Sequence, residues 1–370
     1  TRKESSAASD VYKRQDKNGR LILSHERKMT MDINSMLYRL CSVDGVSGDE
    51  RSASEIALSM LKSYTDDCSI DDFGNVIGHI KSTGNKPKLL LDAHIDRVGL
   101  IVSFIDDNGF IKVGAVGGPD RRVLAAQSVT IHGKEKVKGV VSVLPPHVKS
   151  GDGVPKIEEI VIDTGYTKQE LESRIELGDR ITFDCEPVAM LGTRYCAGAL
   201  DDRCGVASIL AALEMLKSKE LAFDLDVSFT TQEETGESGA KIAVYDLDPD
   251  YILEMDVSFA KTPDSDRAKC ADMSKGVMIG IAPSLSRELS GRLISLAKLE
   301  NIPYQLEVMG GETGTNADTM SVNKSGAKAC TLSIPLKFMH TPAEIIDTDD
   351  VISTAKLITA FATKGGAENG

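Results

Sequence analysis

Tryptophan is absent from this chain of 370 residues, and aromatic residues make up only 5% of it. Aromatic rings are the usual platforms for sugar rings, so their scarcity disfavours a carbohydrate-binding site. Basic residues number 43 against 56 acidic ones, and the resulting net charge of -13 disfavours nucleic acids and anionic membranes as partners. No apolar run approaches the roughly 18 residues that a membrane-spanning helix requires. The hydrophobic content of 41% is typical of a soluble globular protein.

The seven cysteines are odd in number and form no CxxC pair. This pattern favours reduced thiols, and therefore a cytoplasmic location, over a disulfide framework. The sequence contains neither an internal repeat nor a low-complexity tract. Its length allows a large core and suggests two domains more readily than one.

Residues 1–30 are expected to be a disordered or non-native leader. Thr1 to Lys28 is polar and has no apolar segment of the kind found in signal peptides. The stretch Asp10 to Gln15 (DVYKRQ) resembles a translated sequencing adapter, which would place the true start near Met29 or Met31. A native disordered tail is the alternative, and the composition does not separate the two.

Helical and strand-like segments alternate over residues 31–98 and again over residues 189–370. Asp32 to Cys41 has helical apolar spacing, for example, whereas Lys88 to Ala93 (KLLLDA) is a short, buried-looking run. This alternation predicts an α/β domain with a mixed or parallel sheet covered by helices. Further helices are expected at 49–64, 204–217, 286–300 and 349–364, and further strands at 68–71, 75–80, 224–232, 251–257, 304–309 and 329–333.

Residues 99–188 have a different character. Short β-branched runs alternate with Gly, Pro, Asn and Asp, and helical spacing occurs only near Lys168 to Glu176. This pattern predicts a small β-barrel or sandwich. Because candidate site residues lie on both sides of the block, we expect it to be an insertion into one α/β domain.

Side chains able to bind metal ions follow several of the strand-like runs. Open α/β sheets place functional groups at the carboxyl ends of their strands, so residues far apart in sequence can meet there. Imidazoles and carboxylates are suitable ligands for a pair of borderline divalent cations. The candidates are His94, Asp201, Glu233, Glu234, Asp256 and His340.

A lone histidine after a strand is most often structural. His94, however, is followed two residues later by Asp96, and residues two apart in a strand face the same side. Asp96 could therefore accept the second N–H of the imidazole and fix its tautomer, as commonly occurs beside metal-binding histidines.

The acidic pairs have alternative interpretations. Asp201 and Asp202 precede a helical stretch, where either could serve as an N-cap, but a cap would employ only one of them. Glu233 and Glu234 could form a solvated acidic turn. Adjacent acids repel one another unless a cation lies between them or their tasks differ, so Glu234 is a candidate ligand and Glu233 a candidate general base.

Asp256 follows an apolar run and is expected to be buried, where it needs a partner such as a cation. Glu254 lies on the same face and is a second candidate. His340 follows Phe338-Met339 and precedes Thr341-Pro342. Jointly, these groups meet the ligand demand of two Zn²⁺-like ions with an open side for substrate.

Residues 31–365 carry a resemblance to a known family through ordered motifs that lie between Ala93 and Asp347: AHID, ALDDR, TQEETGESGA, EMDVS, GTNAD and SIPLKFMHTPAEIID. Together they resemble those of the co-catalytic dinuclear aminopeptidases of the tetrahedral (TET), glutamyl and deblocking type. The resemblance implies a mixed sheet sandwiched by helices, as in zinc peptidases. It also implies that the inserted β-barrel at 99–188 is a dimerisation domain.

Carried onto this chain, the resemblance implies two divalent metal ions per subunit, Zn²⁺ or Co²⁺, with Mn²⁺ also possible. Asp201 would bridge them, with His94 and Asp256 on opposite metals and Glu234 and His340 completing the ligands. Glu233 would be the catalytic base acting on water activated by the metals, and Asp96 would orient His94. The expected activity is removal of N-terminal residues from short peptides by a homo-oligomer, a dimer or possibly a dodecamer.

Three positions depart from the family pattern without removing a ligand: Arg97, Glu237-Ser238 and the Gly314 to Asp318 segment (GTNAD). The closest alternative is another dinuclear hydrolase, such as a deacylase or carboxypeptidase, because the same ligands would support it. An endoglucanase would leave both histidines without a role, and an inactive assembly protein would leave Glu233 without one.

Overall fold

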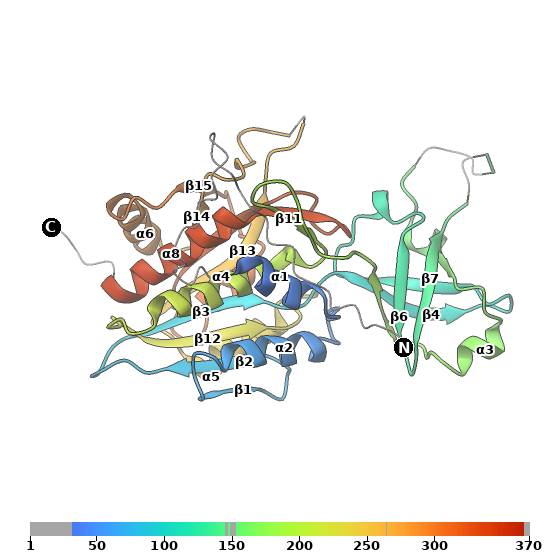
Figure 1. The fold of residues 1–370 in the computed structure, drawn as a ribbon, viewed down its shortest axis with the longest axis horizontal. Coiled ribbons are helices and arrows are strands. Elements are labelled where there is room, and N and C mark those ends of the chain that lie inside the picture. Colours follow the sequence, from blue (N-terminus) through green and yellow to red (C-terminus); the bar gives the residue numbers. More distant parts are fainter. Residues whose placement is uncertain (1–31, 145–146, 149–152, 264, 366–370) are drawn as a thin grey trace, which may run out of the picture. The chain divides into compact units, whose positions relative to one another are not determined.

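The computed structural model describes residues 32–365 except 145–146, 149–152 and 264, so the expected leader at 1–30 lies outside the described residues. The described chain forms a mixed α/β fold with a closed six-stranded barrel (Figure 1), which confirms the predicted fold class. Among these residues, every helix is too short or too polar to cross a membrane.

Eight strands form the main sheet in the order β1-β2-β12-β3-β13-β16-β14-β15. The four neighbours β12, β3, β13 and β16 are parallel. β2 runs antiparallel to β1 and β12, and β14 runs antiparallel to β16 but parallel to β15. The strands are β1 (Cys68–Ile70), β2 (Val76–Ile80), β3 (Lys88–His94), β12 (Asp224–Thr230), β13 (Tyr251–Phe259), β14 (Val277–Ile281), β15 (Tyr304–Val308) and β16 (Lys328–Leu336).

The parallel strands are buried along almost their whole length because helices cover both faces of the sheet. The contacts place α1, α2, α4, α6 and α8 on one face and α5 and α7 on the other; α4 and α8 pack side by side across β3, β13 and β16 (Figure 1). Leu90 packs with α5 and α7, so its neighbours Leu89 and Leu91 face the α4 side. The helices are α1 (Ile33–Cys41), α2 (Arg51–Leu61), α4 (Leu200–Leu216), α5 (Ser238–Leu247), α6 (Arg287–Leu299), α7 (Asn316–Ser321) and α8 (Thr348–Lys364).

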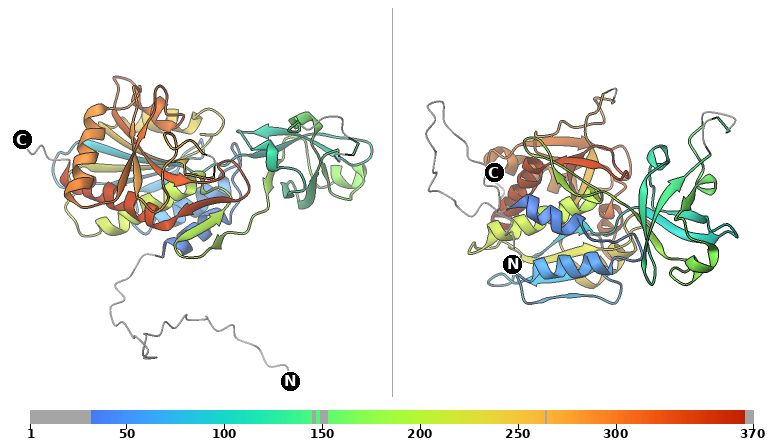
Figure 2. Two further views of the ribbon diagram at one scale, coloured as in Figure 1. Left: turned by 90° about the horizontal axis from the view of Figure 1, so that it is seen from above. Right: turned by 45° about the vertical axis from the view of Figure 1, so that its right-hand side comes forward.

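The barrel lies between β3 and α4 in the sequence and has its own apolar core, which includes Leu100, Val129 and Ile162. Figure 2 shows its strands, coloured cyan to green, in two further views. Its order is β4-β5-β8-β7-β6-β9, closed by pairing of β9 with β4. The strands are β4 (Gly99–Ile105), β5 (Ile111–Val116), β6 (Ser128–His132), β7 (Lys136–Ser142), β8 (Val161–Asp163) and β9 (Arg180–Phe183), with one short helix, α3 (Lys168–Glu172).

A small antiparallel sheet, β10-β11-β17, leads the chain out of the barrel segment. β11 (Arg194–Ala197) is central, between β10 (Val188–Ala189) and β17 (Glu344–Asp347). This pairing brings the start of α4 beside the segment that follows His340, although about 140 residues separate them in the sequence.

Candidate metal centre and active site

The structure brings the five predicted metal ligands together. His94, Asp201 and Asp256 form one group, and Asp201, Glu234 and His340 form a second. Within each group, the ligand atoms lie within 4.8 Å of one another. Asp201 belongs to both groups, so the two potential cation positions are adjacent and share one carboxylate.

His94 is the last residue of β3 and is almost fully buried. Its Nε2 lies 3.1 Å from Asp201 Oδ1 and 3.9 Å from Glu233 Oε2. Its Nδ1 lies 3.5 Å from Asp96 Oδ1, within ion-pair range but too far for a good hydrogen bond. Asp96 is therefore on the expected side of the ring, and Nε2 points into the cluster.

Asp201 and Asp202 have different tasks. Both have non-helical backbone angles at the start of α4, and Asp202 Oδ1 accepts a hydrogen bond from the Gly205 N–H (3.1 Å). Asp202 is thus the capping residue. Asp201 turns the other way, with Oδ1 near His94 and Oδ2 3.4 Å from His340 Nε2. Each carboxylate oxygen of Asp201 therefore faces a different histidine.

Asp96 holds the Glu233-Glu234 turn through the main chain. It accepts hydrogen bonds from the N–H groups of both glutamates (3.0 and 3.2 Å) and from the hydroxyl of Ser47 (2.5 Å). The two side chains then diverge. Glu233 Oε2 lies near His94 Nε2, and Glu234 Oε2 lies 3.3 Å from His340 Nε2.

Asp256 requires a correction to the sequence analysis. We expected a strand at 251–257, but β13 continues to Phe259 because β16 pairs with it along its whole length. The pairing of β13 with the other neighbouring strand, β3, ends earlier, at Glu254 and Asp92. Asp256 therefore lies where β13 and β3 separate, and its side chain can face the other candidate ligands there. Glu254, the second candidate, is buried and accepts a hydrogen bond from Thr315 (3.0 Å).

Two groups that the sequence analysis missed hold His340 in place. The buried Glu344 accepts hydrogen bonds from the N–H groups of His340 (3.0 Å) and Asp201 (3.2 Å). The carbonyl of Gly118, in the inserted segment, lies 3.0 Å from His340 Nδ1. An acid four residues after a candidate ligand was a usable signal for Glu344. The main-chain carbonyl of Gly118 leaves no such signal in the sequence.

The electrostatics of the cluster favour a bound cation. Burial raises the pKa of Glu233 to about 7, and burial with neighbouring carboxylates holds the pKa values of Glu234 and Asp256 well above their usual range. Burial opposes ionisation of Asp201, but its hydrogen bonds to the two histidines outweigh burial and lower its pKa. Burial alone would lower the pKa of His340, yet its hydrogen bond to Asp201 and the charge of Glu234 raise it to about 10.

The donor set fits divalent metal ions on these observations. Carboxylates and imidazoles crowd one buried location, and buried carboxylates require a positive partner. Since His340 Nδ1 faces the Gly118 carbonyl, the lone pair of Nε2 is available to a cation. A cation would replace the protons that the clustered groups otherwise share.

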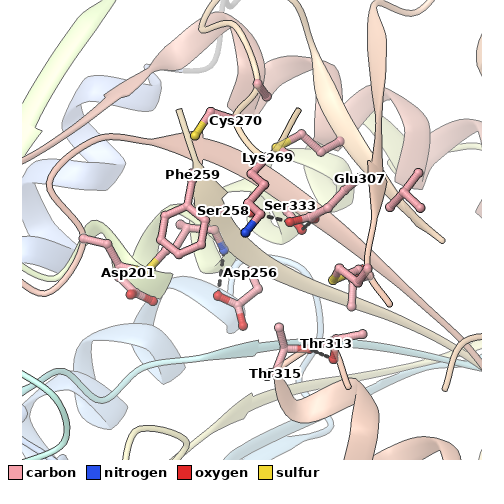
Figure 3. A pocket seen from close by; sticks show the side chains of 18 of the residues that line it. Asp201, Asp256, Ser258, Phe259, Lys269, Cys270, Glu307, Thr313, Thr315 and Ser333 are labelled. Carbon is pink, nitrogen blue, oxygen red and sulfur yellow. Dashed lines mark hydrogen bonds between the residues drawn. The ribbon is translucent and has the colours of Figure 1, made fainter. Parts of the chain in front are cut away.

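A pocket of about 950 Å³ opens beside the cluster (Figure 3). Asp201, Glu233, Glu234, Asp256 and His340 all line it. The pocket continues over the surface of β13, β16, β14 and β15, where Ser258, Ser333 and Glu307 contribute to its wall. It is large enough for part of a peptide beside the clustered acids.

The chain is similar to several known proteins over most of its length. The M42 glutamyl aminopeptidase family matches residues 74–357. The lysyl aminopeptidase of Pyrococcus furiosus is 32% identical over 336 residues, covering 88% of this chain and 95% of that protein. Aminopeptidase APDkam598 from the archaeon Desulfurococcus kamchatkensis has a TM-score of 0.85 at 34% identity, covering 90% of this chain and 94% of that one. The TET1 peptidase of Pyrococcus horikoshii has a TM-score of 0.79 at 28% identity, covering 90% and 99%. The chain described here belongs to the M42 glutamyl aminopeptidase family.

Proposed function

We propose that this protein is a metal-dependent aminopeptidase that removes N-terminal residues from short peptides. The sharing of Asp201 by two ligand groups at the edge of a peptide-sized pocket is the observation that carries the proposal. Relatives named lysyl and glutamyl aminopeptidase support the reaction class, but these names refer to different N-terminal residues of the substrate. Family membership therefore leaves side-chain preference open.

The two ligand groups would hold two divalent cations, Zn²⁺ or Co²⁺, with Mn²⁺ as an alternative. His94 and Asp256 would serve one position, Glu234 and His340 the other, and Asp201 both. Bound there, the cations would polarise the scissile carbonyl and lower the pKa of water.

Glu233 is the proposed general base. Its side chain lines the pocket beside both ligand groups, and its main-chain N–H is fixed by Asp96. With cations held by the neighbouring ligands, its carboxylate would be ionised and could take a proton from water and return it to the leaving amine. Asp96 has a positioning role, because it holds the turn that carries Glu233 and lies against His94.

The test compares Glu233→Gln with Glu234→Gln. Turnover of amino-acid p-nitroanilides should fall by about 10²–10⁴-fold in Glu233→Gln, because the general base is lost. Metal content should remain near two per chain in Glu233→Gln and decrease in Glu234→Gln, which loses a proposed ligand. Glu312→Gln, at an exposed position, is the control. Substantial activity of Glu233→Gln with full metal content would refute the assignment of the base.

The choice of peptide end is tested with blocked substrates. An aminopeptidase requires a free α-amine, so acetylation of the N-terminus should abolish cleavage, whereas amidation of the C-terminus should leave it intact. The reverse pattern would identify a carboxypeptidase, and release of the acetyl group would identify a deacylase.

We further propose a homo-oligomer built from dimers, with the barrel segment at 99–188 as the dimerisation domain. The Pyrococcus horikoshii relative is described as assembling into a tetrahedron or a large octahedral shell, which supports this proposal. The native mass, measured by light scattering during size exclusion, should be an even multiple of the chain mass. A monomeric mass at micromolar concentration would contradict it.

A further inference from the structure

A carboxylate on the far wall of the pocket has no role in the mechanism above. Glu307 lies on β15 and accepts hydrogen bonds from the hydroxyls of Ser333 on β16 (2.6 Å) and Ser258 on β13. Figure 3 shows these three side chains together on the same wall as Asp256. Each oxygen of Glu307 is thus oriented by one serine.

A glycine allows this arrangement. In the β14–β15 ladder, Glu307 is paired with Gly280, and a Cβ at Gly280 would lie only 2.0 Å from Thr331 Oγ1. With no side chain at position 280, Glu307 can cross β14 and reach Ser333 and Ser258. A carboxylate that served only the edge strand would have no need to extend over its neighbour.

The environment of Glu307 lacks a positive partner. Among the residues that the structure describes, only the two serine hydroxyls are found in hydrogen bonds to its side chain, and none of the ion pairs includes it. Burial raises the pKa of Glu307, and its hydrogen bonds to Ser258 and Ser333 offset this only in part. A partly buried carboxylate without a cation, aimed into a pocket, is suited to a cationic ligand.

The position of Glu307 matches the side chain of a substrate rather than its α-amine. Ser333 is the register partner of Asp256, one strand spacing of about 4.8 Å away. Glu307 lies one hydrogen bond beyond Ser333. A peptide whose first carbonyl sits at the proposed metal centre would direct its first side chain over this distance, which the four-carbon stem of lysine can span.

We propose that Glu307 selects substrates whose N-terminal residue is lysine or arginine, by pairing with the cationic end of that side chain. The inference rests on the proposed aminopeptidase function and adds the substrate class.

Lys269 is the main competing determinant, since it also lines the pocket and would suit an acidic N-terminal residue (Figure 3). Its side chain is exposed, however, and so is that of the neighbouring Arg267. Water and salt screen an exposed ammonium far more than a partly buried carboxylate. Lys261 is already paired with Asp272 (2.8 Å). The balance therefore favours a cationic substrate.

The test measures kcat/KM for Lys, Arg, Leu and Glu p-nitroanilides with the metal-loaded enzyme. We expect the wild type to prefer Lys and Arg over Leu, and to cleave Glu least. Glu307→Gln keeps the shape but removes the charge, and one serine hydroxyl must then accept from the amide N–H instead of donating. Its Lys-to-Leu ratio should fall by about 10- to 100-fold, as for loss of a buried ion pair. Glu307→Asp should restore part of the preference, Lys269→Ala should retain it, and Glu312→Gln is the matched control.

Several results would overturn the inference. A preference of the wild type for Leu or Glu would overturn it directly. This outcome needs no variant, so the inference can be tested even if Glu307→Gln fails to fold. An equal fall for all substrates in Glu307→Gln would assign Glu307 to the α-amine or to structure. Loss of a Glu preference in Lys269→Ala would assign selectivity to Lys269. A wild type that cleaves no amino-acid anilide would instead refute the proposed function.

Discussion

Two buried carboxylates position the site through main-chain amides rather than by facing the pocket. Asp96 accepts hydrogen bonds from the main-chain N–H groups of Glu233 and Glu234. Glu344 accepts hydrogen bonds from those of Asp201 and His340. Each ties together side chains delivered by segments far apart in the sequence. The geometry of the candidate ligands therefore depends on groups that are not themselves candidate ligands.

Glu344→Ala should weaken metal binding. The change leaves the amides of Asp201 and His340 without their acceptor, so both candidate ligands lose their orientation. We expect a 10- to 100-fold rise in the dissociation constant for Zn²⁺, in the range of about 10–100-fold found for groups that orient metal ligands. Competition against a chelating dye measures it.

Asp350→Ala is the matched control for this prediction. Asp350 also accepts two main-chain amides, from Ser274 (2.8 Å) and Gly276 (2.7 Å), but it contacts none of the candidate ligands. It should lower stability and leave Zn²⁺ affinity unchanged. Equal affinities in the two variants would show that Glu344 only supports the fold.

The sequence predicted the candidate ligands better than the groups that hold them. His94 ends the largely apolar strand β3, and the Glu233-Glu234 pair comes shortly after β12, so their chemistry stands out. The residue Glu344 sits in a short strand, β17, whose pairing with β11 depends on contacts more than 140 residues apart. Such long-range pairing has no local pattern.

At the scale of elements, three parts of the sheet domain carried weak signals. We did not predict α5, α7 or β14. α5 begins after Glu237, which has a left-handed backbone (φ 59°) and makes no side-chain cap, so the usual start signal is missing. α7 has only six residues. β14 has five, including Gly280, and glycine disfavours strands. In each case the tertiary packing determines the element.

Gly280 should be intolerant of a side chain. Gly280→Ala would place its Cβ 2.0 Å from Thr331 Oγ1 and 2.8 Å from Leu285 Cδ1, so the free energy of unfolding should fall by about 1–3 kcal/mol from overpacking. Urea unfolding followed by circular dichroism measures it. In a Thr331→Ala background the loss should be smaller, because the closest clashing atom is gone.

Gly291→Ala is the control for that substitution. Gly291 lies in α6 with open space where its Cβ would be, so alanine should raise stability by about 0.5–1 kcal/mol through helix propensity. Equal stability of the two alanine variants would show that the close contact of Gly280 with Thr331 does not require a glycine at position 280.

At the scale of the whole molecule, the change from strand–helix alternation to short β-branched runs identified both the α/β fold and the place of the barrel. This change of pattern could not show that a residue of the inserted segment contacts the candidate metal centre. Gly118, just after β5, provides the carbonyl beside His340. The inserted segment and the sheet are therefore coupled at the candidate metal centre as well as through the chain.

The buried acids also couple stability to pH and metal over the whole molecule. Burial raises the pKa values of Glu50 and Glu233 to about 7 and of Glu344 to about 8. Between their ordinary values near 4.5 and these values, the folded state holds more protons than the unfolded state, so stability falls as pH rises. A bound divalent cation takes the place of protons in the cluster, and its stabilising effect should therefore increase with pH.

We expect the melting temperature of the metal-free protein to fall by roughly 5–10 °C between pH 5 and pH 8, given about 2–4 °C per kcal/mol in a protein of this size. Circular dichroism in EDTA measures the fall, and parallel scans with Zn²⁺ should show larger stabilisation at pH 8 than at pH 5. Glu50→Gln should reduce the pH dependence, because it keeps an acceptor for the Gly48 and Gln232 amides without an ionisable group. A metal-free melting temperature that rises with pH over this range would mean that the buried acids ionise on folding, and that the cluster does not need a cation to compensate its charge.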